Sequence, residues 1–126
     1  MKEIEYIVPA MQLDTLDFMS GHKWNILQRV DISRNKLLSI QPLMDFKNLR
    51  FLNARNNRIV EINFELPNIE EIDLSANSLR SFPIFLIQHN KLKKLVLSNN
   101  SIRNLTYMSC TNFMSLEELD ISHNWY

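Results

Sequence analysis

Residues 69–79 read IEEIDLSANSL, and this stretch decides the fold. Apolar side chains stand at its first, fourth, sixth and eleventh positions, with Asn77 at the ninth. The same eleven-residue frame recurs as LQRVDISRNKL from Leu27, LRFLNARNNRI from Leu49, LKKLVLSNNSI from Leu92 and LEELDISHNWY from Leu116. Successive starts lie 20 to 24 residues apart. A period of this length is typical of a protein built from stacked repeats.

Each frame predicts a short strand followed by a turn. The first, fourth and sixth side chains point into a core while those between them face outward, and stacked copies form a parallel sheet. The ninth position is asparagine in every copy, namely Asn35, Asn57, Asn77, Asn100 and Asn124. An amide both donates and accepts hydrogen bonds, so these residues are predicted to form a ladder that ties the turn of each repeat to the next.

The pattern Leu-x-x-Leu-x-Leu-x-x-Asn-x-Leu resembles the signature of the leucine-rich repeat family over about residues 27–126. The resemblance implies an α/β solenoid, a horseshoe with a parallel, concave β-sheet of about five repeats. It divides the chain into repeats 27–48, 49–68, 69–91 and 92–115 and a truncated repeat 116–126. It is specific for the fold and says little about activity, because function belongs to sites rather than folds.

Residues 1–26 do not carry the frame. The polar and apolar residues of Lys2–Val8 alternate, which favours a short strand, and Pro9 ends it. The apolar residues between Ala10 and Met19 favour one or two helical turns. A strand and a helix before the first repeat predict an N-terminal cap that covers the open end of the core. A degenerate repeat from Ile4 is the alternative.

Composition argues against several functional classes. The 14 basic and 14 acidic side chains cancel, so no global field attracts nucleic acid. No apolar run reaches the roughly 20 residues that cross a bilayer, so membrane insertion is not expected. A lone cysteine, Cys110, excludes an internal disulfide framework. The three histidines lie in separate segments and the chain has one glycine, so neither a metal site, nor a cofactor, nor an enzymatic activity is expected.

Positions two, three, five, seven and eight of each frame are expected to face solvent on the concave side of the sheet. The charge at positions two and three alternates in sign from the second copy onward, so neighbouring strands should neutralise each other. The acidic fifth positions lie too far apart for one calcium ion. Apolar Phe51 and Val96 stand out on this polar face, either as contact hot spots or as residues that serve local packing. The candidate partner-binding residues are Arg29, Arg50, Phe51, Asn53, Arg55, Glu71, Asp73, Lys94, Val96 and Glu118.

The ends carry a closer resemblance. The cap that runs through Lys23-Trp24-Asn25-Ile26 into the first repeat resembles the N-terminal layout of secreted leucine-rich immune proteins of mosquitoes. His123-Asn124-Trp125-Tyr126 resembles the start of extracellular C-terminal caps, without the proline and cysteine of that pattern. This likeness implies an innate-immune adaptor that pairs through later cysteines and coiled coils and holds a complement-like thioester protein. Those later regions lie outside this sequence.

The leading hypothesis is a non-enzymatic protein–protein interaction module that acts in innate-immune recognition or as an adaptor. The alternative is a cytosolic scaffold or regulatory subunit that recruits an enzyme or motor. The compartment stays open between extracellular and cytoplasmic, since two glycosylation sequons, at Asn99 and Asn104, do not decide it. The sequence stops inside the fifth copy, which would leave a strand edge bare, so we expect it to be a fragment of a longer chain.

Overall fold

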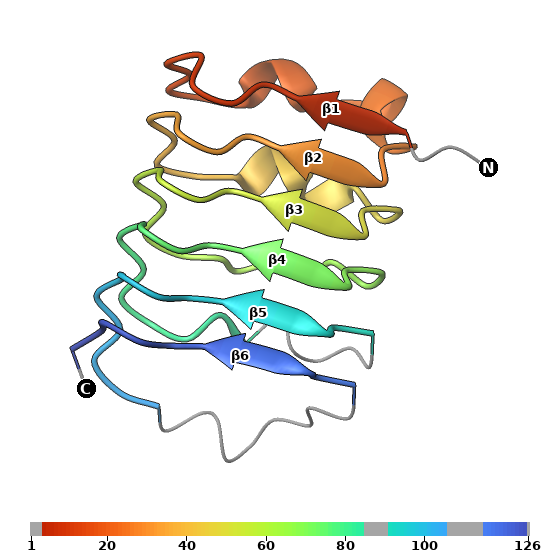
Figure 1. Ribbon diagram of the computed structural model, residues 1–126. Coiled ribbons are helices and arrows are strands. Elements are labelled where there is room, and N and C mark those ends of the chain that lie inside the picture. The colour runs from red at the N-terminus through yellow and green to blue at the C-terminus, as the bar shows by residue number, and fades with distance from the viewer. Residues whose placement is uncertain (1–3, 85–90, 106–114, 126) are drawn as a thin grey trace.

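Six short parallel strands form one sheet in the computed structural model, which describes residues 4–84, 91–105 and 115–125. The strands are β1 Glu5–Ile7, β2 Arg29–Asp31, β3 Phe51–Asn53, β4 Glu71–Asp73, β5 Lys94–Val96 and β6 Glu118–Asp120. Their order in the sheet is their order in the sequence, so the chain coils in one direction as a solenoid (Figure 1). The predicted parallel solenoid is thus confirmed, with one strand more than the five repeats supply.

The described segments that follow β1, β2 and β3 return behind the sheet, which makes two layers (Figure 1). In the described parts of these segments lie the 3-10 helices η1 Asp17–Met19, η2 His22–Trp24 and η3 Gln41–Asp45. The segment 60–68 contains no helix. No helix among the described residues is long and apolar enough to cross a bilayer.

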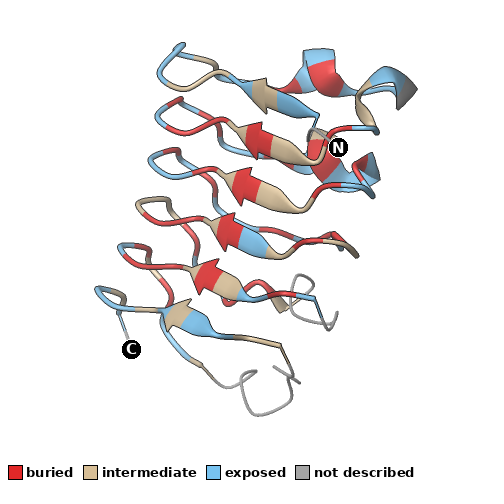
Figure 2. Cartoon of the chain, turned by 45° about the vertical axis from the view of Figure 1, so that its right-hand side comes forward, coloured by how far each residue is buried: buried red, intermediate tan, exposed pale blue. Residues whose placement is uncertain are grey.

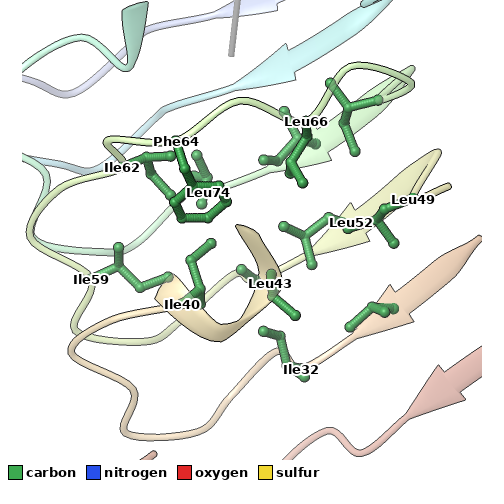
Figure 3. Packing of buried hydrophobic residues seen from close by; sticks show 14 of the residues in the cluster. Ile32, Ile40, Leu43, Leu49, Leu52, Ile59, Ile62, Phe64, Leu66 and Leu74 are labelled. Carbon is green, nitrogen blue, oxygen red and sulfur yellow. The ribbon is translucent and has the colours of Figure 1, made fainter. Parts of the chain in front are cut away.

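The core fills the space between the two layers. Figure 3 shows Leu52 and Leu74 pointing from the strands toward Ile40, Leu43 and Phe64 of the returning segments. The first, fourth, sixth and eleventh frame positions are buried in the four repeats that start at Leu27, Leu49, Ile69 and Leu92. In the repeat from Leu116 the first, fourth and sixth positions, Leu116, Leu119 and Ile121, are half-buried, because β6 forms the edge of the sheet (Figure 2). Removal of this apolar surface from water is the main force that holds the repeats together.

Strand pairing keeps all copies in phase. Phe51 of β3 pairs with Arg29 of β2 and with Glu71 of β4, and the next partners are Lys94 and Glu118. Equal frame positions therefore form straight rows across the sheet. A slip of one residue would turn each apolar set toward solvent, so the burial pattern holds this register.

The N-terminal segment supplies the additional strand. Glu5 of β1 pairs with Arg29, 24 residues later, one residue more than the spacing from Ile4 to Leu27. Met11 consequently takes the place of the turn asparagine, and its side chain is 64% exposed. Despite this mismatch, the backbone N–H groups of Met11 and Leu13 both donate to Oδ1 of Asn35.

The helix predicted between Ala10 and Met19 is shorter than expected. Only Asp17–Met19 is helical, as one 3-10 turn, because the residues before it form a repeat-like turn with Ala10 and Gln12 at φ 57. Leu16 and Met19 are nonetheless fully buried, so this segment covers the first end of the core.

Every turn passes through a left-handed residue at the eighth frame position. Its φ lies between 54 and 58 at five sites, Arg34, Asn56, Ala76, Asn99 and His123. Left-handed backbone is costly for side chains other than glycine and, to a smaller degree, asparagine. The turn geometry is therefore imposed by the stacked neighbours, since most of these residues do not favour it.

Some residues expected to line the convex side lie outside the described residues. These are Phe85, Leu86, Met108 and Phe113. Three residues considered for other reasons, Cys110, His89 and Tyr126, also lie outside the described residues. The convex apolar residues of the earlier repeats, among them Phe46, Ile62 and Leu66, are buried as expected.

Candidate functional site

The candidate site is the sheet face, defined here as the surface of β1–β6 that points away from the core. A shallow hollow of about 360 Å³ lies over it. Six of the ten candidate residues line the hollow, Arg29, Phe51, Asn53, Glu71, Asp73 and Lys94. The remaining lining residues are Ile7, Val30, Asp31, Leu52 and Ile72. The repeat register brings these side chains together from five strands.

Charges at the second frame position form a chain across three strands. The Nε atom of Arg50 bonds to Oε2 of Glu70, and Nζ of Lys93 lies 3.6 Å from Oε1 of the same carboxylate. The Glu70 side chain is only 18% exposed. The hydrogen bond from Arg50 holds the pKa of Glu70 below its ordinary value against the opposing effect of burial, and Lys93 adds to the lowering.

Third-position charges pair toward the two ends of the sheet. Arg29 Nε lies 3.5 Å from Oε1 of Glu5, and Lys94 Nζ lies 3.6 Å from Oε2 of Glu118. Two further candidate residues, Glu118 and the second-position Arg50, are not part of the lining of the hollow. Much of the alternating charge is neutralised within the face, as the alternation of sign suggests.

Phe51 lies beneath two arginines. The guanidinium carbons of Arg29 and Arg50 lie 4.2 and 5.0 Å from its ring centroid, distances typical of cation–π contacts. The ring is half-buried. The ring thus holds these two guanidinium groups in place on the sheet face.

The fifth frame position serves the backbone. Oδ1 of Asp31, Asn53 and Asp73 accepts a hydrogen bond from the backbone N–H two residues later, over 2.9 to 3.1 Å. Ser75 Oγ also donates to Asp73. Local bonds of this kind fix the chain as it leaves the strand. This role is not among those predicted from the sequence, although the recurring Asp-x-Ser triplets are typical of such a turn.

Asp120 repeats this arrangement on β6. The hydroxyl of Ser122, and then its backbone N–H, lower the pKa of Asp120. Val96 holds the same position on β5 and has no atom that can accept. The fifth-position row is thus structural in part, which reduces the contact role expected of Asn53 and Asp73.

The two remaining candidates lie beside the hollow. Arg55 is exposed, and its Nη1 donates to Ser75 Oγ over 2.9 Å. Val96 is half-buried on β5. Among the described residues, no group of three or more His, Cys, Asp or Glu side chains is placed to hold a metal ion.

The ninth-position asparagines form a row along the turns. Nδ2 of Asn57 donates to the carbonyls of Ala54 in its own repeat and Ile32 in the preceding one, and Oδ1 accepts from Leu37 N–H. Asn35, Asn77, Asn100 and Asn124 make equivalent bonds. Each amide therefore ties its repeat to the one before it, whereas the sequence reasoning placed the link with the one after.

Comparison with known proteins agrees with this architecture. A family model described as "Leucine rich repeat" matches residues 67–125. Protein PAC2 of Saccharomyces cerevisiae is 31% identical over 142 residues, which covers 95% of this chain and 26% of that protein. Human Toll-like receptor 1 is 32% identical over 103 residues, 78% of this chain and 13% of the receptor.

The solved structure of an internalin from Listeria monocytogenes superposes with a TM-score of 0.61. It covers 94% of this chain and 40% of the internalin, at 17% sequence identity, so it shows a shared fold alone. The chain spans about a quarter of the yeast protein and a smaller share of the receptor.

Proposed function

Because this chain belongs to the leucine-rich repeat family, we propose that its sheet face binds another protein and that the protein acts in innate-immune recognition or as an adaptor. Repeats of this family are protein-interaction modules, and the similarity to Toll-like receptor 1 and to the CD180 antigen of mouse supports the immune assignment. Those receptors are far longer than this chain, so the role of the whole protein belongs to the proposal.

The observation that carries the proposal is the gathering of six candidate side chains over one hollow. The strands below them are held by the apolar core behind and by the asparagine row beside them. The backbone of such a support loses little conformational freedom when a partner binds, which favours affinity. The hollow is lined by both polar and apolar groups, as protein interfaces are.

Photo-cross-linking tests the location of the partner. A photoreactive phenylalanine analogue replaces Lys94, whose side chain is 44% exposed at the hollow, or the exposed Glu61 on the returning segment 60–68. Both variants are irradiated in extracts of cells that make the protein. We expect a discrete cross-linked partner from position 94 and none from position 61.

A second variant checks the role of the aromatic platform. Phe51→Ala removes the ring under Arg29 and Arg50 and is expected to weaken the captured complex about tenfold, as loss of a central contact does. Capture from position 61 and not from position 94 would place the binding surface on the convex side and overturn the proposal.

A further inference from the structure

The two cations that line the hollow each form an ion pair with an acidic side chain of this chain. Arg29 is paired with Glu5 and stacks on Phe51, and Lys94 is paired with Glu118. Both acidic partners lie outside the lining of the hollow. The positive charge of the hollow is thus directed toward the two ends of the sheet.

The anions of the hollow are not satisfied in the same way. Glu71 is exposed, and within the described part of the chain its carboxylate makes no ion pair or side-chain hydrogen bond. Asp31 and Asp73 accept turn N–H groups through Oδ1, and neither forms an ion pair with a described residue. Arg55, which follows β3 by two residues, is outside the lining and donates to Ser75.

The strand register spreads the three carboxylates over the floor of the hollow. Glu71 and Asp73 are two residues apart on β4, about 7 Å, and Asp31 lies two strands away, roughly 10 Å. One metal ion cannot reach all three, since its ligands must lie at about 2.4 Å. Long flexible side chains that end in a positive charge can reach each of them.

We infer that the sheet face selects a basic partner, an extended segment whose lysine or arginine side chains pair with Glu71 and with the outer oxygens of Asp31 and Asp73. This inference rests on the proposed protein-binding function and names the chemistry of the partner. Phe51 beside Glu71 offers the apolar stem of such a side chain a surface to lie against. An acidic segment would meet like charge at the centre of the hollow, which opposes binding.

Peptide binding tests the selectivity directly. Two fluorescein-labelled octapeptides, one of alternating arginine and serine and one of alternating glutamate and serine, are titrated with the intact chain and followed by anisotropy. At about 50 mM NaCl, where screening is weak, the basic peptide is expected to bind at least about tenfold more tightly than the acidic one. Added salt should reduce the difference.

Two variants with the same net charge locate the binding site. Glu71→Gln removes the unpaired carboxylate of the hollow, and Glu61→Gln removes an exposed one from the returning segment. We expect Glu71→Gln to weaken binding of the basic peptide about fivefold, the size of one partly exposed charge pair. Glu61→Gln should leave it within the error of the measurement, with the circular dichroism of both variants unchanged.

Failure of this inference differs from failure of the proposed function. Absence of binding, equal binding of both peptides, or equal effects of the two substitutions would overturn the basic selectivity even if position 94 captures a natural partner. Selective binding that Glu71→Gln weakens would support it even if no partner is captured at position 94.

Discussion

Each turn asparagine forms hydrogen bonds with several backbone groups at once. Asn57 is 8% exposed and bonds to four backbone groups of two repeats. No other side chain of this size both donates two hydrogen bonds and accepts in this geometry. The recurrence of asparagine at the ninth position therefore has a local physical cause, which is the need to satisfy buried backbone groups between stacked turns.

Substitution of Asn57 tests this cause. Asn57→Ala leaves the buried Leu37 N–H without its acceptor, and we expect the free energy of unfolding to fall by about 2–4 kcal/mol. Asn57→Asp keeps an acceptor for Leu37 but points an oxygen at the Ile32 and Ala54 carbonyls, so it should also destabilise. Urea unfolding measures both. The exposed control Asn63→Ala should change stability by less than about 0.5 kcal/mol.

At the scale of the strand and its turn, the repeats differ in one respect. Four fifth-position side chains accept the N–H two residues later, whereas Val96 on β5 leaves the Ser98 N–H without that bond. Valine suits a strand well. The fourth repeat therefore combines a good strand residue with a less constrained turn.

Val96→Asn is expected to stabilise the chain by about 0.5–1 kcal/mol, the usual net value of a hydrogen bond. Val96→Asp supplies the same acceptor, but its pairing partners are Asp73 and Asp120, so repulsion should cancel the gain near neutral pH. Thermal unfolding of the two variants compares these effects. An aspartate variant more stable than the asparagine variant would contradict the proposed role of like charge.

The chain of second-position charges, Arg50, Glu70 and Lys93, makes the free energy of unfolding depend on pH with a definite sign. The folded pKa of Glu70 is lowered from its ordinary 4.5, chiefly by Arg50. The contribution to stability is thus present above about pH 4.5 and is lost as the pH falls through the folded pKa. Glu70→Gln should cost about 0.5–1 kcal/mol near neutral pH and almost nothing once the pH lies below the folded pKa of Glu70, because glutamine does not titrate. A constant difference at all pH values would contradict this account.

At the scale of the whole molecule, each repeat contacts its neighbours and little else. Stability in such a solenoid is a sum of repeat and interface terms, so damage at one end should stay near that end. The N-terminal end is covered by Leu16 and Met19 and by the ring contact between Tyr6 and Trp24, whose centroids lie 5.2 Å apart.

Leu16→Ala should lower stability by about 2–4 kcal/mol, as a large-to-small change in a core does. Hydrogen exchange should show the loss of protection mainly in β1 and β2, with β4 and β5 nearly unchanged. The matched control Leu38→Ala removes a side chain that is 59% exposed and should have little effect. Equal loss of protection along the whole sheet would show that the chain unfolds as one unit.

The sequence by itself determined the repeat frame, the parallel sheet, the buried apolar positions and the place of the asparagines. These are readable because each copy solves the same local problem with the same residues at the same spacing. The N-terminal strand does not match the repeat frame, because Met11 stands at the position of the turn asparagine. Its offset of 24 residues from β2 is visible only in the pairing of the two strands.

Only the tertiary structure decided how the charges on the sheet face are shared. Glu71 and Glu118 both flank Lys94 in the register, and the sequence treats them alike. In the folded chain Lys94 pairs with Glu118, which leaves the Glu71 carboxylate open to a partner. Such a choice depends on how far flexible side chains reach across a twisted sheet, and no local pattern of residues encodes that distance.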